Sequence, residues 1–182
     1  MKHLACYSIL FFCFIASALG SGGPFGLEKG MSLEEVAVVL GETPTTVGKL
    51  DPAEADYIYT AGPTVFGPEF PRCIMLITPE AGLSNLKLMT GPMISGQSGA
   101  DITHSRIRDR LILEYGLPVT DYLSPLSSRP LDIRGITSRW EQPEKDGLDL
   151  VTLDWFTPSN VIQLYFRFDN WEAARKEIDS SR

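Results

Sequence analysis

The sequence predicts an α+β protein made of two tandem α-β-β-β repeats, which form a curved antiparallel sheet with the helices packed on one face. Two amphipathic segments, residues 32–44 and 101–118, predict the helices, because each ends in a glycine with a proline shortly after it. Segments with alternating or β-branched residues follow each helix and predict the strands. We expect the first repeat at residues 21–95 and the second at 96–182, after a leader at 1–20.

The leader has the features of a cleaved secretory signal peptide. A short basic start precedes the apolar residues 4–18, and Ala18 and Gly20 are the small residues at the positions that signal peptidase reads. An uncleaved membrane anchor is the alternative, but an apolar run of about 15 residues is shorter than the ~20 that span a bilayer. We therefore expect a periplasmic or secreted protein that starts at Ser21 and keeps no stable membrane span.

The composition narrows the possible partners. The 182 residues are 43% hydrophobic, as is typical of a globular chain. The formal net charge of −7 argues against nucleic acid or an anionic membrane surface as a partner, because both require a basic face. Removal of the leader takes away Cys6 and Cys13, so Cys73 is left alone and no internal disulfide can form. Cys73 lies in an apolar run and is expected to be a buried hydrophobic residue.

The first repeat begins with a helix whose two ends are marked in the sequence. Ser32 and Glu35 have the spacing of a capping box, and Gly41 can adopt the left-handed C-terminal conformation. The apolar stripe of this helix consists of Leu33, Val36, Ala37 and Leu40. Strands are expected at residues 56–60, 72–78 and 83–90. A short turn joins the last two and favours an antiparallel hairpin. Residues 45–55 are expected to form a loop, and residues 91–100 a linker.

The second repeat is expected to follow the same plan. Its helix ends before Gly116, and an irregular connection at residues 117–131 follows. Strands are expected at residues 135–142, 148–156 and 161–168. The Asp146-Gly147 pair predicts a hairpin turn between the first two of these strands. Asp169 and Glu172 have capping-box spacing and predict a C-terminal helix. Its docking residues are expected to be Trp171, Ala174 and Ile178.

Part of the chain resembles two known families of envelope and secreted proteins. Residues 30–36 and 40–44, with the following strand Asp56-Tyr57-Ile58-Tyr59, resemble the SmpA/OmlA (BamE-type) outer-membrane assembly proteins. The tandem arrangement is similar to that of the β-lactamase inhibitory protein. The resemblance covers most of residues 25–170 and implies an envelope protein of duplicated fold. The chain lacks the lipobox cysteine of the first family and the disulfides of the second, and a shared fold does not imply inhibition of an enzyme.

The sequence offers little material for catalysis. His104 is the only histidine outside the leader, and adjacent residues on a helix do not face each other, so His104 and Ser105 are not expected to act as base and nucleophile. We expect His104 to be a polar residue in the first turn of its helix. Asp146, Asp149 and Asp154 surround a hairpin and could bind calcium or serve a small hydrolase or metal-dependent enzyme. Because they lack the spacing of a calcium loop, a solvated turn is favoured. We expect no catalytic residues, no metal site and no cofactor.

The polar sides of the strands are the remaining candidates for function. In the strand at 161–168, the residues Gln163, Tyr165 and Arg167 alternate with apolar ones and should point away from the helices, with Asn85 and Lys87 on the equivalent face of the first repeat. Tyr and Arg concentrate binding energy at interfaces. We therefore expect a non-enzymatic protein-binding module of the cell envelope, with an unidentified protein partner on this solvated face and its loops. An ordinary solvated face of a structural envelope protein is the other possibility.

Overall fold

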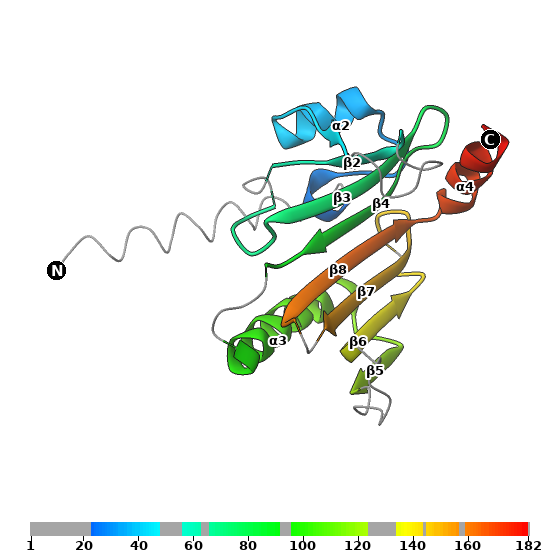
Figure 1. Cartoon of the computed structure of the whole chain (residues 1–182). Helices are drawn as coiled ribbons and strands as arrows, with labels where there is room; N and C mark the ends of the chain where they lie inside the picture. The colour runs from blue at the N-terminus through cyan, green and yellow to red at the C-terminus, as the bar shows by residue number, and fades with distance from the viewer. Residues whose placement is uncertain are drawn as a thin grey trace.

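The fold is α+β, with one antiparallel sheet of eight strands and three α-helices in the part of the chain that the structure describes (Figure 1). The structure is a computed structural model. It describes residues 23–47, 56–62, 66–91, 96–123, 134–143, 145–156 and 159–181. The expected leader and its cleavage site lie outside these residues. Within them, no helix combines the length and the apolar character needed to cross a membrane.

A helix precedes four strands twice along the chain. In order, the elements are η1 (Pro24–Gly26), α2 (Leu33–Leu40), β1 (Thr45–Thr46), β2 (Ile58–Thr60), β3 (Arg72–Thr78), β4 (Gly82–Met89), α3 (Gly96–Tyr115), β5 (Thr120–Leu123), β6 (Arg134–Glu141), β7 (Leu148–Phe156), β8 (Val161–Phe168) and α4 (Trp171–Ser180). We call the elements through β4 the first half, and those from α3 onward the second half. The six expected strands are confirmed, and β3, β7 and β8 have the predicted bounds.

The two halves meet in the middle of the sheet. The strand order is β1-β2-β3-β4-β8-β7-β6-β5, so β4 and β8, the last strand of each half, are antiparallel neighbours (Figure 1). The contact extends past the end of β4, where the Thr90 amide donates to the Ile162 carbonyl and the Ile162 amide donates to the Thr90 Oγ1, both at 2.9 Å. Hydrogen bonds therefore join the two halves directly.

Three local expectations are corrected. β1 lies in the expected loop 45–55, and β5 lies in the expected irregular connection 117–131. Both are short edge strands without an apolar alternation, so the pattern that marks the other strands is missing from them. α3 begins at Gly96, which makes the second part of the expected linker 91–100 helical. Ala100 is completely buried, and this packing outweighs the weak helix preference of the Gly- and Ser-rich sequence.

The ends of α2 are those predicted. The Glu35 amide donates to the Ser32 Oγ at 3.3 Å, and the Ser32 amide donates to the Glu35 carboxylate at 2.8 Å, which completes the capping box. Gly41 has a φ of 70° at the C-terminal end. Val36 is fully buried, and Leu33 and Leu40 pack against the same core. The amphipathic stripe of α2 thus faces the sheet.

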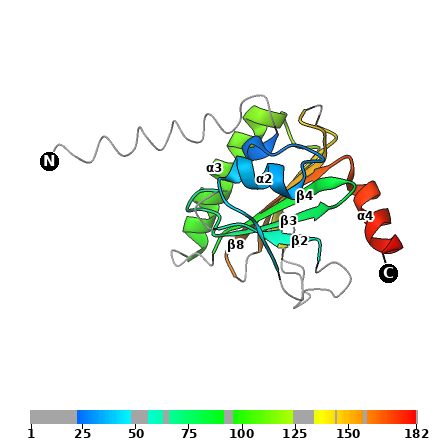
Figure 2. The ribbon, with the colours of Figure 1, turned by 90° about the horizontal axis from the view of Figure 1, so that it is seen from above.

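The expectation that all the helices pack on one face of the sheet is wrong. α2 and α3 cover the face that carries the larger core, which includes Met75 of β3. α4 instead packs Ala174 and Ile178 against Leu76, the residue next to Met75. Because neighbouring residues of a strand point to opposite faces, α4 lies on the other side of the sheet. Figure 2 shows α4 separated from α2 and α3.

Polar contacts hold α4 on the turn between β3 and β4. The predicted capping box of Asp169 and Glu172 is wrong, because Asn170 is the N-cap residue and no side-chain cap hydrogen bond forms. Asp169 instead pairs with Lys29 at 2.8 Å. The Asn170 amide group donates to the carbonyls of Ala81 and Leu83, at 2.8 and 3.0 Å. Sequence spacing alone did not reveal these partners, which are far away in the chain.

Candidate functional site

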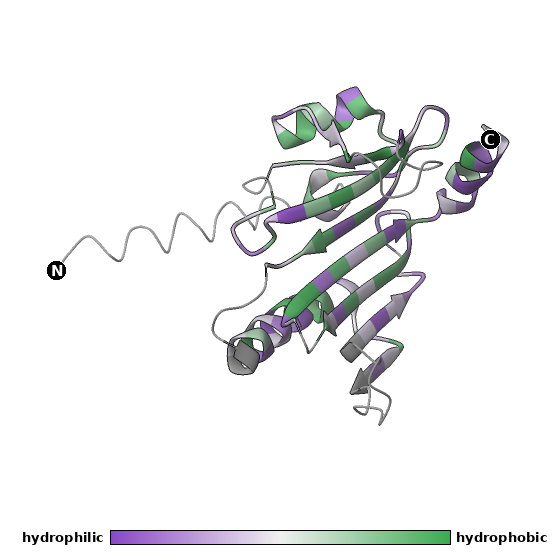
Figure 3. Cartoon of the chain, viewed as in Figure 1, coloured by the Kyte–Doolittle hydropathy of each residue, from purple (hydrophilic) through white to green (hydrophobic). Residues whose placement is uncertain are grey.

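The best candidate for a functional surface is the face of the sheet opposite α2 and α3, which we call the open face. Cross-strand pairing defines it, since directly paired residues point to the same side. One continuous row of pairs crosses six strands: Ile74, Lys87, Tyr165, Thr152, Arg139 and Thr120. A second row contains Arg72, Met89, Gln163 and Asp154. Figure 3 shows the alternation of hydrophilic and hydrophobic residues along β8 that separates this face from the core.

The five residues predicted from the sequence do share this face. Lys87 pairs with Tyr165, and Asn85 pairs with Arg167, across the β4–β8 junction, while Gln163 pairs with Met89. The expected solvation is wrong for Asn85, which is only 9% exposed. Its partner in β3 is Leu76, which belongs to the apolar cluster under α4. This corner of the sheet is therefore covered, and the open face begins beyond it.

Tyr165 and Lys87 form the centre of the open face. The Lys87 Nζ lies 5.8 Å from the centroid of the Tyr165 ring, in the range of a cation–π contact. Tyr165 is half-buried, and burial raises the pKa of its phenol to about 12. The hydroxyl therefore stays protonated at neutral pH and can donate a hydrogen bond to a partner.

Two of the arginines on the open face are already neutralised. The Arg167 Nε donates to both Asp149 oxygens, at 2.8 and 3.1 Å, and this hydrogen-bonded carboxylate raises the pKa of Arg167 further. The Arg139 Nε lies 3.0 Å from a Glu141 oxygen. These pairs leave little net charge on the β6–β7 side of the face.

Arg72 and Lys87 are different, because no ion pair joins either of them to a carboxylate within the described residues. They lie on the neighbouring strands β3 and β4, beside the half-buried Ile74 and Met89. Arg72, Ile74 and Met89 were not selected from the sequence. Residues 73–77 of β3 are all apolar, so the sequence of this strand does not show which of its residues face outward. Only the pairing with β4 places Arg72, Ile74 and Met89 on the open face.

The three aspartates of the alternative metal or hydrolase hypothesis have separate surroundings. Asp149 is bound by Arg167, and Asp146 stands in a turn with a φ of 64°. Asp154 is only 4% exposed and accepts a 3.5 Å hydrogen bond from Thr152 Oγ1. In the described ranges, no group of three or more His, Cys, Asp and Glu side chains is placed to hold a metal ion. The sequence proximity of these aspartates therefore does not bring them together.

His104 is not the polar first-turn residue that was expected. It lies in the middle of α3, is 2% exposed and has its ring 6.1 Å from that of Trp155. The Nε2 of His104 and the Nε1 of Trp155 are both buried and have no hydrogen-bond partner among the described residues. Burial and the nearby Arg108 lower the pKa of His104. Ser105, its neighbour, is exposed, so the two residues do not face each other.

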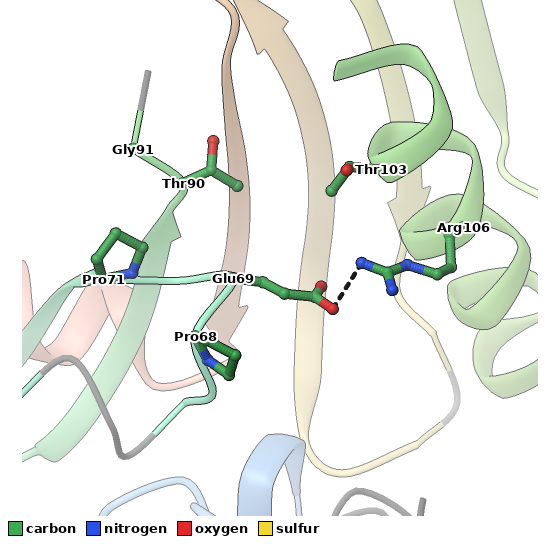
Figure 4. A pocket seen from close by; sticks show the side chains of 7 residues that line it. All are labelled: Pro68, Glu69, Pro71, Thr90, Gly91, Thr103 and Arg106. Carbon is green, nitrogen blue, oxygen red and sulfur yellow. Dashed lines mark hydrogen bonds and ion pairs between the residues drawn. The ribbon is translucent and has the colours of Figure 1, made fainter. Parts of the chain in front are cut away.

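A shallow pocket of about 310 Å³ lies on the boundary between the two halves. Its lining residues are Pro68, Glu69, Pro71, Thr90, Gly91, Thr103 and Arg106. Figure 4 shows Glu69 and Arg106 pointing toward each other across it, and their ion pair measures 2.6 Å. Among the described lining residues, the two charged groups of the pocket are paired with each other, and this ion pair joins the β2–β3 connection to α3.

Comparisons with protein-family models, with curated proteins and with solved structures gave no match to this chain. The resemblance to the SmpA/OmlA and β-lactamase inhibitory protein families therefore stays a prediction from the sequence.

Proposed function

We propose that this chain is a non-enzymatic, exported protein-binding module of the cell envelope, which binds a protein partner through the open face and its adjoining loops. The observation that supports this best is the pair Arg72 and Lys87, which no ion pair joins to a carboxylate in the described part of the chain and which lies among Tyr165, Ile74 and Met89 on adjoining strands. A surface that mixes cations, an aromatic ring and apolar side chains has the composition that protein interfaces favour. Export to the periplasm or the exterior rests on the leader sequence.

A tandem repeat is the second part of this proposal. It is supported by the order of elements, in which one helix precedes four strands in each half, and by the mirrored strand order on the two sides of the β4–β8 junction. Each repeat has four strands in this proposal, in place of the three expected from the sequence. Joining the two repeats makes the open face long enough to receive a folded protein or an extended segment.

The charge of the open face favours an acidic partner. The whole chain has a formal net charge of −7. Arg72, Lys87, Arg139 and Arg167 nevertheless lie on this face, where the described carboxylates are Glu141, Asp149 and Asp154, with Glu172 of α4 near Arg167. Because Asp154 is buried, its charge contributes less to the electrostatic potential outside the sheet. The carboxylates of an acidic partner would be attracted to Arg72 and Lys87 and repelled by the acidic rest of the surface, which directs such a partner to the open face.

The test is an affinity capture from an envelope extract of the host, with the purified wild-type protein and the Lys87→Glu variant side by side. We expect wild type to recover a defined partner, and Lys87→Glu to bind it about tenfold more weakly, because the substitution reverses the charge of a half-buried residue at the centre of the face. Binding by wild type should also weaken as salt is raised from 0.05 to 0.5 M, because salt screens exposed charges.

Lys176→Glu is the matched control, because Lys176 is an exposed residue of α4 and the charge change is the same. This variant should recover as much partner as wild type. The Tyr165→Ala/Arg167→Ala double variant should no longer recover the partner. Asp149→Ala removes the ion pair of Arg167 but keeps its guanidinium, so this variant shows which of the two losses weakens binding. Equal recovery by wild type and Lys87→Glu would remove the open face as the binding site.

A further inference from the structure

The side of α3 that faces away from the sheet carries two large apolar residues in full contact with solvent. Ile102 is 70% exposed and Leu113 is 87% exposed, whereas Ile107 and Leu111 of the same helix are buried against the sheet. Arg106 and Asp109 lie between the two apolar residues, with side chains 61% and 75% exposed. We call Ile102, Arg106, Asp109 and Leu113 the outer stripe of α3.

The outer stripe has a symmetric order. Its members are spaced by four, three and four residues, so they follow one line along the helix. Read in either direction, the order is apolar, charged, charged, apolar, and the two charges are opposite. In an antiparallel pair of such helices related by a two-fold axis, Ile102 of one copy faces Leu113 of the other, and Arg106 faces Asp109.

We propose that the outer stripe of α3 binds the same stripe of a second copy of this chain, forming a two-fold symmetric dimer. Charge complementarity selects this occupant, because the reversed stripe places a cation against an anion twice and an apolar residue against an apolar residue twice. A parallel arrangement would align like charges with each other. The contact lies on the opposite side of the sheet from the open face, so the dimer presents two open faces for binding.

The geometry also sets the strength of the dimer. Ile102 and Leu113 are separated by about 16 Å along the helix axis, at 1.5 Å for each residue. We expect one pair of helices to bury an area at the low end of specific interfaces and the association to be weak, with a dissociation constant in about the micromolar range. Glu69 holds one Nη of Arg106 at 2.6 Å, which fixes the side chain beside the stripe, and Asp109 has a longer ion pair of 3.9 Å with Arg108 of the same helix. The remaining guanidinium donors can reach Asp109 of the second copy.

Sedimentation equilibrium over a hundredfold range of protein concentration tests the dimer. Wild type should change from monomer to dimer across this range, and Leu113→Glu should weaken the association by at least tenfold, since it places a carboxylate in the apolar contact. Val38→Glu is the matched control, because Val38 is 81% exposed on α2 and lies off the stripe. A wild type that stays monomeric, or a Leu113→Glu variant that associates as well as wild type, would overturn the proposal.

Charge reversal tests the antiparallel register. Arg106→Asp alone and Asp109→Arg alone should each weaken association about tenfold, because each places like charges together twice. The Arg106→Asp/Asp109→Arg double variant restores both pairs and should regain most of the lost affinity. Glu69→Gln, which removes only the intrachain partner of Arg106, should leave a dimer. Two single variants that associate as wild type does, or a double variant that is weaker than both, would refute the register.

Discussion

His104 shows how much one residue can contribute to the behaviour of this fold. Its imidazole is buried beside Trp155, and the charged groups around it are Arg108, Asp121, Asp101 and Asp154. Burial, with Arg108, lowers its pKa more than the three carboxylates raise it. His104 therefore stays neutral in the folded protein at a pH where the unfolded chain has bound a proton.

This difference predicts a loss of stability in mild acid. His104 has an ordinary pKa of 6.5 in the unfolded chain and a lower one in the fold, so the unfolded state binds more protons below about pH 6.5. The free energy of unfolding should fall by up to about 1.4 kcal/mol for each pH unit between these two pKa values. Urea unfolding of wild type and of His104→Gln at pH 8 and pH 5 measures the effect.

The Gln variant should show a smaller drop between the two pH values, whatever its absolute stability, because glutamine does not titrate. The carboxylates do not obscure this comparison. Asp121, whose pKa is lowered by the hydrogen bond from Arg108, and Glu35, whose pKa is lowered by Ser32, are present in both proteins, so their contribution to the drop is common to both. Equal drops in the two proteins would mean that His104 is not the group responsible.

At the scale of the elements, the sequence predicts what local patterns determine and fails where distant contacts decide. The bounds of β3, β7 and β8 follow from β-branched and alternating residues, and the ends of α2 follow from Ser32 and Gly41. The side of the sheet on which α4 lies depends on Asn170 and its partners across the chain, which no local pattern contains.

The features of the candidate site fall into the same two groups: those that local patterns predict and those that distant contacts determine. Alternation along β8 was enough to place Gln163, Tyr165 and Arg167 on one face. The pairing of Arg167 with Asp149 and the burial of Asn85 required the sheet register and the position of α4. The burial of His104 could have been found, because it precedes Ile107 by three residues and Leu111 by seven and so lies on the buried stripe of α3.

The docking of α4 gives a prediction for a whole element. Ile178 is 1% exposed and belongs to the small cluster with Leu76 and Ala174 on the open side of the sheet. Ile178→Ala should lower the free energy of unfolding by about 2 to 3 kcal/mol, because it removes buried methyl groups and leaves a cavity. Urea unfolding followed by circular dichroism measures the change.

Asp179→Ala is the comparison for this variant, since Asp179 is the exposed next residue of α4. It should change the free energy of unfolding by less than about 0.5 kcal/mol. If Ile178→Ala were as stable as wild type, α4 would contribute little to the stability of the sheet, and its polar ties to the β3–β4 turn would hold it alone.

At the scale of the whole molecule, the two halves share one core. The larger apolar cluster contains Val36 and Leu86 of the first half together with Leu111 and Phe166 of the second. The β4–β8 pairing and the Glu69–Arg106 ion pair also cross the boundary. Neither half can therefore unfold without exposing apolar surface of the other, and we expect one cooperative unfolding transition.

Thr90→Val tests this cooperativity at the junction of the halves. Thr90 is 3% exposed, and its hydroxyl accepts the hydrogen bond of the Ile162 amide. Valine keeps the shape but leaves that buried amide unpaired, so the free energy of unfolding should fall by about 1 to 3 kcal/mol. Two probes can follow the two halves separately. One is labelling of the buried Cys73 thiol, with Cys6 and Cys13 replaced by Ser, and the other is the fluorescence of Trp140 and Trp155, with Trp171, which packs near Leu76 of the first half, replaced by Phe.

Both probes should give the same midpoint in urea for wild type, and both midpoints should move by the same amount in Thr90→Val. The Cys73 thiol is a suitable probe because burial raises its pKa to about 12, which keeps it unreactive until its surroundings unfold. A midpoint that moves for one probe alone would mean that the halves unfold independently. In that case the shared core and the β4–β8 pairing would not couple them, and each half would have to be stable by itself.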